Sequence, residues 1–382
     1  MVWLSWTLVM AGTNLAAPLY AVYARLFGFS SLVITLVFAT YAVVLIPSLV
    51  VFGSLSDRVG RRPVMLAGLA TALAGLFVFD YAGSTGWLFA ARALQGMAVG
   101  MVSGPATAAL VELDPRRAQQ RPALLASLAQ AGGSMLGPLV AGFLAEYAAW
   151  RLHLSFLVLA GLTVLVAVAV VGVPEGRAAG RGRWRIQPPR VPEEIRAPFA
   201  RVSLTAGVVW GALSLYLSIV PSYASDLLGT HDLALLGVVS AVALAFSCLT
   251  QALTWRSHPE VRRTQAVGLV VLGLGCLALV AAGPAHSLAL LMVAAAATGS
   301  GHGAGVFAAQ HELNSIAPPD HRGEVTAAFI CCIYAGVASS VVGSGLLALG
   351  LSLPDSIGLV AVLLAVAAGV LAVWQARVRR VA

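Results

Sequence analysis

The sequence predicts an all-α membrane protein with twelve transmembrane helices, arranged as two six-helix bundles. Its composition, its long apolar stretches and the placement of its arginines predict this fold. Of the 382 residues, 59% are hydrophobic and 10% are charged, whereas a soluble domain carries about 25% charged residues. A globular core cannot bury so much apolar surface, so lipid must be the solvent for most of the chain. This composition excludes a soluble enzyme, a secreted disulfide scaffold and a disordered chain.

Twelve apolar stretches are each close to the length that a membrane-spanning helix needs, about 20 residues. Charged residues, glycines or prolines separate them. They cover residues 3–24, 31–54, 63–83, 87–111, 122–148, 152–173, 202–225, 233–255, 264–283, 287–311, 325–349 and 356–376. The even number predicts that both termini lie on the same side of the membrane.

The arginines predict which side that is. All 23 basic residues are arginine, and with a cytoplasmic N-terminus 20 of them fall in inner loops or the C-terminal tail, as the positive-inside rule requires. The three exceptions are Arg25, Arg92 and Arg151. The net charge of +8 is therefore a topology signal, and because the arginines are dispersed over six segments we expect no nucleic-acid partner. The Arg-only, Ala/Gly/Val-rich composition favours a bacterial inner membrane, with both termini cytoplasmic.

The chain divides at its one long polar stretch, residues 174–200, which is rich in Arg, Gly and Pro and is interpreted as a cytoplasmic linker. It separates an N-terminal six-helix bundle, residues 1–173, from a C-terminal bundle, residues 201–382. The halves resemble each other: 108–113 (AALVEL) recurs as 308–313 (AAQHEL), at an offset of 200, and 61–62 recurs as 262–263. Such parallel repeats place a substrate site between the halves, near the bilayer midplane.

The loop after the second stretch carries the most specific motif. It reads Gly53-Ser-Leu-Ser-Asp57-Arg58-Val-Gly60-Arg61-Arg62. This segment resembles the GxLaDrxGrr signature of the major facilitator superfamily, and the resemblance covers nearly the whole chain. It implies alternating access with a conformational latch on the inner side. Asp57 would face the N-terminal end of the eleventh helix, Arg61 would pair with Glu112 or Asp114, and Gly53 would let a neighbouring helix approach closely.

Two further motifs lie inside predicted helices. Arg92, Gln95 and Gly96 are similar to the family's RxxqG pattern in helix four. The alternatives for Arg92 are snorkelling to the headgroups or facing the cavity beside a carboxyl group, for which Asp80 is one partner. The helix-five segment around Gly133, Gly137, Pro138 and Gly142 resembles the GxxxGPxxGG motif of the antiporter branch, with Ala141 replacing one glycine. That resemblance implies efflux in exchange for protons.

The proton-coupling residue is left open, because helix one carries Asn14 and no acid where many relatives carry one. The candidates are Asp80, Arg92, His302 and Glu312. Aromatic residues of helices one and seven, with Asn14, are candidates for lining an apolar cavity. These cavity candidates are Asn14, Tyr20, Trp210 and Tyr216.

The predicted function is proton-coupled efflux of small hydrophobic compounds, such as drugs or antibiotics, by a monomer. Uptake or facilitated diffusion of a metabolite is the alternative within transport. A membrane-embedded enzyme would need paired acids, a metal cluster or a GxSxG turn, and none is present. A non-transporting receptor is the third possibility. Without lysine there is no GxxxxGK[ST] loop for ATP, and we expect no cofactor and no metal.

Overall fold

The structure is a computed structural model of residues 1–382, and it describes all of them except 114–119, 175–189, 258–259, 319–320 and 378–382. The described residues form helices and no strand. The helices are α1 Val2–Asn14, η1 Ala17–Leu19, α2 Tyr20–Phe27, α3 Ser31–Val59, α4 Arg61–Asp80, α5 Thr85–Glu112, α6 Gln120–Tyr147, α7 Leu154–Val171, η2 Glu193–Ile195, α8 Arg196–Ser218, α9 Val220–Leu228, α10 Leu233–Ser257, α11 Val261–Ala285, α12 Leu288–Ile316, α13 Arg322–Leu347 and α14 Leu353–Arg377. Each of the twelve predicted stretches corresponds to one helix or to one interrupted helix.

Eleven of the described helices are long and apolar enough to cross a membrane. The first predicted span is missing from that number because it is divided into α1, η1 and α2. Pro18 lies in the interruption and has no N–H to donate to the carbonyl of Asn14. The seventh span is interrupted in the same way between α8 and α9, where Pro221 follows the break. With the divided first span included, the all-α fold of twelve transmembrane helices is confirmed.

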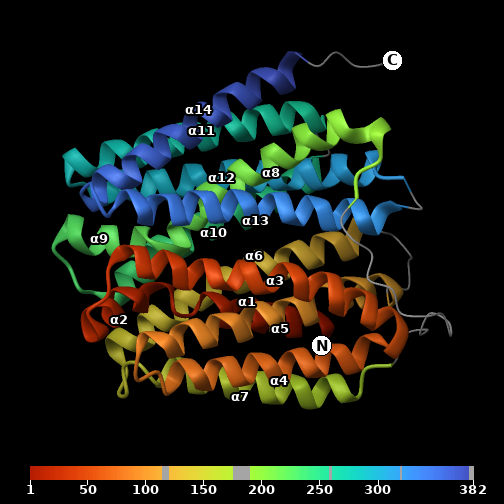
Figure 1. Ribbon diagram of the computed structural model, residues 1–382, viewed down its shortest axis with the longest axis horizontal. Helices are drawn as coiled ribbons and strands as arrows, with labels where there is room; N and C mark the ends of the chain where they lie inside the picture. Colours follow the sequence, from red (N-terminus) through yellow and green to blue (C-terminus); the bar gives the residue numbers. More distant parts are fainter. Residues whose placement is uncertain (114–119, 175–189, 258–259, 319–320, 378–382) are drawn as a thin grey trace. The chain divides into compact units, whose positions relative to one another are not determined.

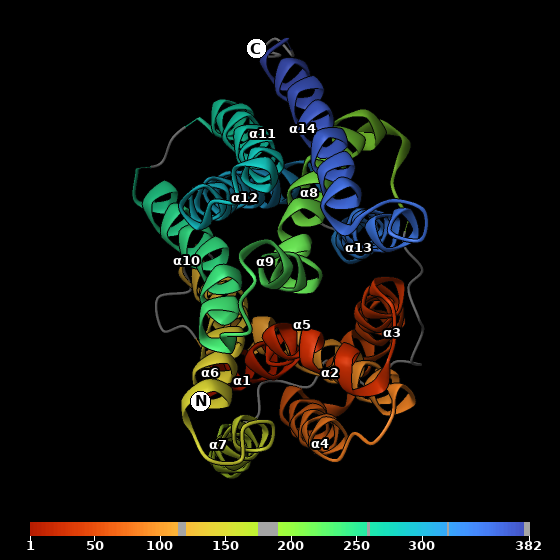
Figure 2. The same cartoon turned by 90° about the vertical axis from the view of Figure 1, so that its left-hand side faces the viewer.

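The chain folds into two compact units. Unit 1 contains residues 1–29, 37–187 and 233–238, and unit 2 contains residues 30–36, 188–232 and 239–382. In unit 1, α1 packs against α5 and α6, while α4 lies between α5 and α7 (Figure 1). In unit 2, α8 packs against α12, α13 and α14 (Figure 2). The first residues of α3 and of α10 belong to one unit, and the rest of each helix belongs to the other.

The two units repeat the same helix packing. Gly68 of α4 lies against α5 where a Cβ would meet Ala98, and Gly268 of α11 lies against α12 where a Cβ would meet Gly301. The offset is therefore 200 between α4 and α11 but 203 between α5 and α12. The alignment that makes Glu112 and Glu312 equivalent is wrong by three residues, since the position equivalent to Glu312 is Ala109.

Candidate functional site

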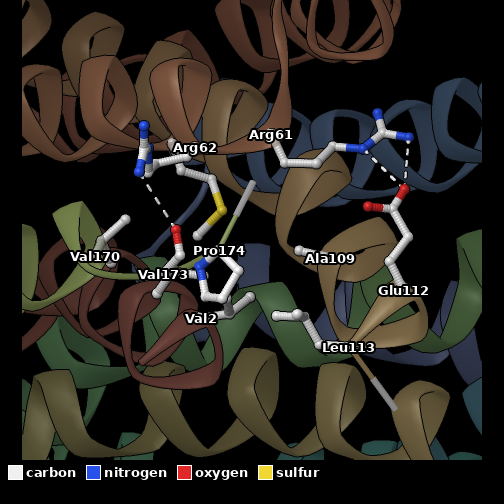
Figure 3. A pocket seen from close by; sticks show the side chains of 10 residues that line it. Val2, Arg61, Arg62, Ala109, Glu112, Leu113, Val170, Val173 and Pro174 are labelled. Carbon is white, nitrogen blue, oxygen red and sulfur yellow. Dashed lines mark hydrogen bonds and ion pairs between the residues drawn. The ribbon is translucent and has the colours of Figure 1, made fainter. Parts of the chain in front are cut away.

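The predicted latch motif forms a polar cluster where α3 ends and α4 begins. Gly60 joins the helices with φ of 103°, a backbone conformation that favours glycine. The turn brings Arg61 back over α3, where its guanidinium donates to the Asp57 carboxylate and, at 2.8 Å, to the Ser56 hydroxyl. From α5, the Glu112 carboxylate lies 3.2 Å from Arg61 Nη2 (Figure 3). We call Asp57, Arg61 and Glu112 the latch cluster.

The next arginine binds a helix end rather than an acid. Arg62 Nη1 donates to the carbonyl of Val171 at 3.0 Å and to the carbonyl of Val173 at 3.5 Å. Figure 3 shows the contact with Val173. These carbonyls lie at the C-terminal end of α7, where backbone acceptors have no partner within the helix. Arg62 therefore ties α4 to α7. A cavity with room for about one water molecule lies beside it. The cavity is lined by Val2, Arg61, Arg62, Met65, Ala109, Glu112, Leu113, Val170, Val173 and Pro174.

Other parts of the predicted motif lie near the latch cluster. A Cβ at Gly53 would meet no heavy atom within 4 Å, whereas a Cβ at Gly104 of α5 would lie 3.9 Å from the Cα of Gly53, so the close helix approach at this glycine stays a prediction. Arg58 is exposed. The alternative partner Asp114 lies outside the described residues. Glu112, whose side chain is 33% exposed, is the acid that pairs with Arg61.

Arg92 lies in the interior of unit 1 and binds the interruption of the first span. Its side chain is fully buried, so the snorkelling alternative is wrong. Arg92 Nη1 donates to the carbonyl of Thr13 at 2.6 Å and to Gln95 Oε1 at 2.9 Å. Gln95 Nε2 donates to the carbonyl of Gly12 at 2.8 Å. The pair thus supplies donors to carbonyls near the end of α1.

The guanidinium of Arg92 is also covered by aromatic rings. Its central carbon lies 4.9 Å from the ring centre of Phe38 and 4.8 Å from that of Tyr41, in cation–π geometry. Gly96, one turn further along α5, allows contact with the backbone of Tyr41. The suggested pairing of Arg92 with Asp80 is wrong, because Asp80 binds a histidine that the sequence analysis did not single out. Asp80 Oδ1 lies 2.9 Å from His153 Nδ1.

The glycine motif of α6 packs this helix against two neighbours within unit 1. A Cβ at Gly133 would collide with the carbonyl of Thr7, and a Cβ at Gly137 with the carbonyl of Ala11. Gly142 lies against the first turn of α10, at Leu233. The motif therefore serves close backbone contact, as small residues do between membrane helices.

We expect Gly137→Ala to lower the thermal unfolding temperature of the protein by several degrees. The added methyl group has no space against Ala11, and overpacking of this kind costs about 1–3 kcal/mol. Gly132→Ala is the matched control, since a Cβ there meets nothing within 4 Å. Thermal unfolding of purified protein in detergent compares the two. Equal unfolding temperatures would show that α1 and α6 do not pack at Gly137 as described.

Asn14 and the aromatic cavity candidates are packed inside their own units. Asn14 Nδ2 donates to the Met10 carbonyl and to Ser134 Oγ, both at 3.1 Å. Tyr20 and Tyr216 are buried. The Tyr20 hydroxyl has no hydrogen-bond partner among the described residues, whereas the Tyr216 hydroxyl lies next to the hydroxyl of Thr298. An unpaired buried hydroxyl is costly, which makes Tyr20 a candidate for binding water or a ligand.

His302 lies in the core of unit 2 among neutral polar groups. Its Nδ1 is 2.8 Å from Ser247 Oγ, which also accepts from Gln251 Nε2 at 3.1 Å. Trp210 meets the imidazole edge to face, with ring centres 4.7 Å apart. The other ring nitrogen, Nε2, has no partner among the described groups. His302 is thus buried without a neighbouring acid in the contacts described.

Glu312 is held in a buried network that the sequence analysis did not predict. The Arg201 guanidinium of α8 donates to Glu312 of α12 and to Gln375 of α14. Gln265 of α11 donates to the second Glu312 oxygen at 2.8 Å. Gln375 in turn donates to Gln265 and, at 3.2 Å, to Thr205 of α8. The five residues are at most 8% exposed, and the Arg201 guanidinium is the buried counter-charge of Glu312.

The comparisons with known proteins agree with this architecture. Residues 2–338 match the family model described as Major Facilitator Superfamily. MdtD of Escherichia coli O1:K1 / APEC, a protein named for multidrug resistance, is 28% identical over 148 residues, as is its counterpart in Shigella boydii serotype 18. The match covers 39% of this chain and 31% of the length of those relatives.

Two solved structures share the fold over nearly the whole chain. Both are crystal structures of a bacterial homolog of the human lysosomal transporter Spinster. The occupied inward-facing form has a TM-score of 0.74 at 17% identity, covering 99% of this chain and 96% of that one. The unoccupied inward-facing form has a TM-score of 0.69 at 15% identity, covering 98% and 94%. The chain is a multi-pass integral membrane protein, and it belongs to the Major Facilitator Superfamily.

Proposed function

We propose that this transporter exports small, mostly apolar compounds in exchange for protons. It works by alternating access of two six-helix bundles, residues 1–173 and 201–382, joined by the segment 174–200. In this proposal it is a monomer of a bacterial inner membrane with both termini in the cytoplasm. The latch cluster then lies on the cytoplasmic side.

The latch cluster is the observation that carries the proposal. Arg61 is held between an acid of its own motif, Asp57, and an acid of α5, Glu112. The Asp57 side chain is 58% exposed, so it keeps capacity to accept further hydrogen bonds. In the state closed to the cytoplasm, Asp57 would accept from the N-terminal end of α13, where helix amides favour a carboxylate. Breaking that contact would open the cytoplasmic side.

The direction of transport rests on α6. The close contacts of Gly133 and Gly137 with α1 are what the antiporter-type motif requires of this helix. The relatives named for multidrug resistance support the same direction. The buried rings of Tyr20 and Tyr216 add aromatic surface to the interior, which fits an apolar substrate.

The test is transport by purified protein in proteoliposomes, with the neutral dye Nile red as the probe. We expect an imposed proton gradient to drive Nile red against its own gradient, and Nile red to move protons when added without one. Equilibration of the dye at a rate independent of the proton gradient would contradict exchange and favour a facilitator.

A further inference from the structure

An acid–histidine pair lies at the end of unit 1 opposite the latch cluster. Asp80 is the last residue of α4, whose first residue is Arg61, and 20 helical residues place these ends about 30 Å apart. The Asp80 side chain is 5% exposed, whereas that of His153 is 55% exposed. The pair therefore joins a carboxylate inside the protein to an imidazole that reaches the surface.

A strained turn presents the histidine. Trp150, between α6 and α7, has φ of 61°, which is rare for a bulky residue. The carbonyl of Trp150 accepts from the backbone N–H of His153 at 2.8 Å, so this turn places His153 directly before α7. Such strain persists where surrounding contacts hold it, and it gathers at functional sites.

Buried polar groups continue from this pair into the unit. Tyr23 lies close enough to both Asp80 and Tyr20 for electrostatic interaction, and Tyr20 is similarly close to Arg92. The Tyr20 hydroxyl and Arg92 Nε have no hydrogen-bond partner among the described residues. The interior of unit 1 near Asp80 thus contains further buried polar side chains.

We propose that Asp80 and His153 form a proton-binding site that loads the coupling proton from the external solution. The inference rests on the proposed function for its orientation and for the existence of a coupling proton. With a neutral imidazole the pair has a net charge of −1. One proton from the external water converts it to an imidazolium–carboxylate pair with no net charge. Neutralising a buried carboxylate lowers the cost of holding it in the apolar unit.

Few other charged groups surround this pair among the described residues. Tyr23 faces it from α2, and Arg25 lies in the last turn of that helix. Arg92, on α5, interacts electrostatically with Tyr20. The remaining charges at this end, Glu146 and Arg151, lie 3.8 Å from each other. Asp80 is therefore the acid with which a protonated His153 would form an ion pair.

The first experiment tests proton binding without any substrate. Thermal unfolding of the full chain in lipid nanodiscs is measured at about pH 8 and about pH 6, a range in which histidine side chains gain a proton. We expect the wild-type protein to unfold roughly 2–4 °C higher at the lower pH, because the imidazolium then pairs with the carboxylate. His153→Asn and Asp80→Asn keep a hydrogen bond and lose that difference. His286→Asn, which removes an imidazole that faces a backbone carbonyl, keeps it. The same difference in all four proteins overturns the proposal.

The second experiment tests coupling in proteoliposomes with Nile red. We expect Asp80→Asn to reduce transport driven by a proton gradient at least about tenfold. Wild-type gradient-driven transport by Asp80→Asn overturns the assignment of the coupling proton. If the wild-type protein does not move Nile red, the proposed export of this compound is wrong. The unfolding measurements then test the proton-binding site independently of transport.

Discussion

We expect Asp57→Asn to abolish transport of Nile red in proteoliposomes while the amount of folded protein in the membrane stays at the wild-type level. The Asp57 side chain is 58% exposed, and an ion pair in such a position contributes about 0–1 kcal/mol to stability. Its proposed role lies in the state closed to the cytoplasm, where a carboxylate would bind the N-terminal end of α13. An amide has no charge to place there. The substitution therefore removes one state of the cycle without unfolding the protein.

The control for Asp57→Asn is Glu193→Gln, which removes the same charge from an exposed ion pair outside the motif. Glu193 lies 3.1 Å from Arg196, and both side chains are more than half exposed. We expect wild-type transport from this variant. Gel filtration and the unfolding temperature establish that both variants are folded. Transport by Asp57→Asn at the wild-type rate would show that the latch cluster takes no part in the cycle.

The sequence predicts the helices of this protein well because lipid makes them easy to recognise. A span must be long, apolar and free of charge, and the predicted stretches agree with the helices to within about six residues at either end. The interruption of the first span was not predicted, although Pro18 is its cause. An apolar window that contains one proline is indistinguishable, by composition, from an uninterrupted span.

Individual side-chain partners were harder to predict than helices. The family motif fixes where Arg61 lies, so its predicted acidic partner at the end of α5 was limited to Glu112 or Asp114. No such motif fixed Asp80, and its partner His153 lies 73 residues further along the chain, placed by the turn at Trp150. The alignment of α5 with α12 was also wrong by about one helical turn. Sequence similarity alone cannot distinguish an offset of 200 residues from one of 203.

The buried network of unit 2 shows the same limit. Arg201 directly follows the linker and was counted among the 20 arginines of the inner side, because the positive-inside rule accounts for any arginine near a helix end. In the structure it is 3% exposed and belongs to the core. Gln265 and Gln375 are polar residues inside apolar runs, and that pattern was the available signal of a buried network.

We expect Glu312→Ala to destabilise the protein severely, with little folded protein recovered from the membrane. The substitution leaves the Arg201 guanidinium buried without its counter-charge, and breaking a buried pair in this way costs about 3–5 kcal/mol. Gln265 also loses the carboxylate oxygen to which it donates at 2.8 Å. The measurement is thermal unfolding in detergent. Unfolding is detected by the labelling of Cys276, whose thiol is buried in the folded protein.

Two variants show whether the missing counter-charge is the cause. Glu112→Ala removes an acid from the latch cluster, where Glu112 is 33% exposed and Arg61 retains Asp57, and we expect a loss of only about 0–1 kcal/mol. Arg201→Gln combined with Glu312→Gln removes both charges and keeps hydrogen-bonding groups, so it should recover most of the lost stability. If Glu312→Ala unfolds at the wild-type temperature, Arg201 does not depend on Glu312 as its counter-charge. If the double variant is no more stable than Glu312→Ala, the network is held by its shape and not by its charges.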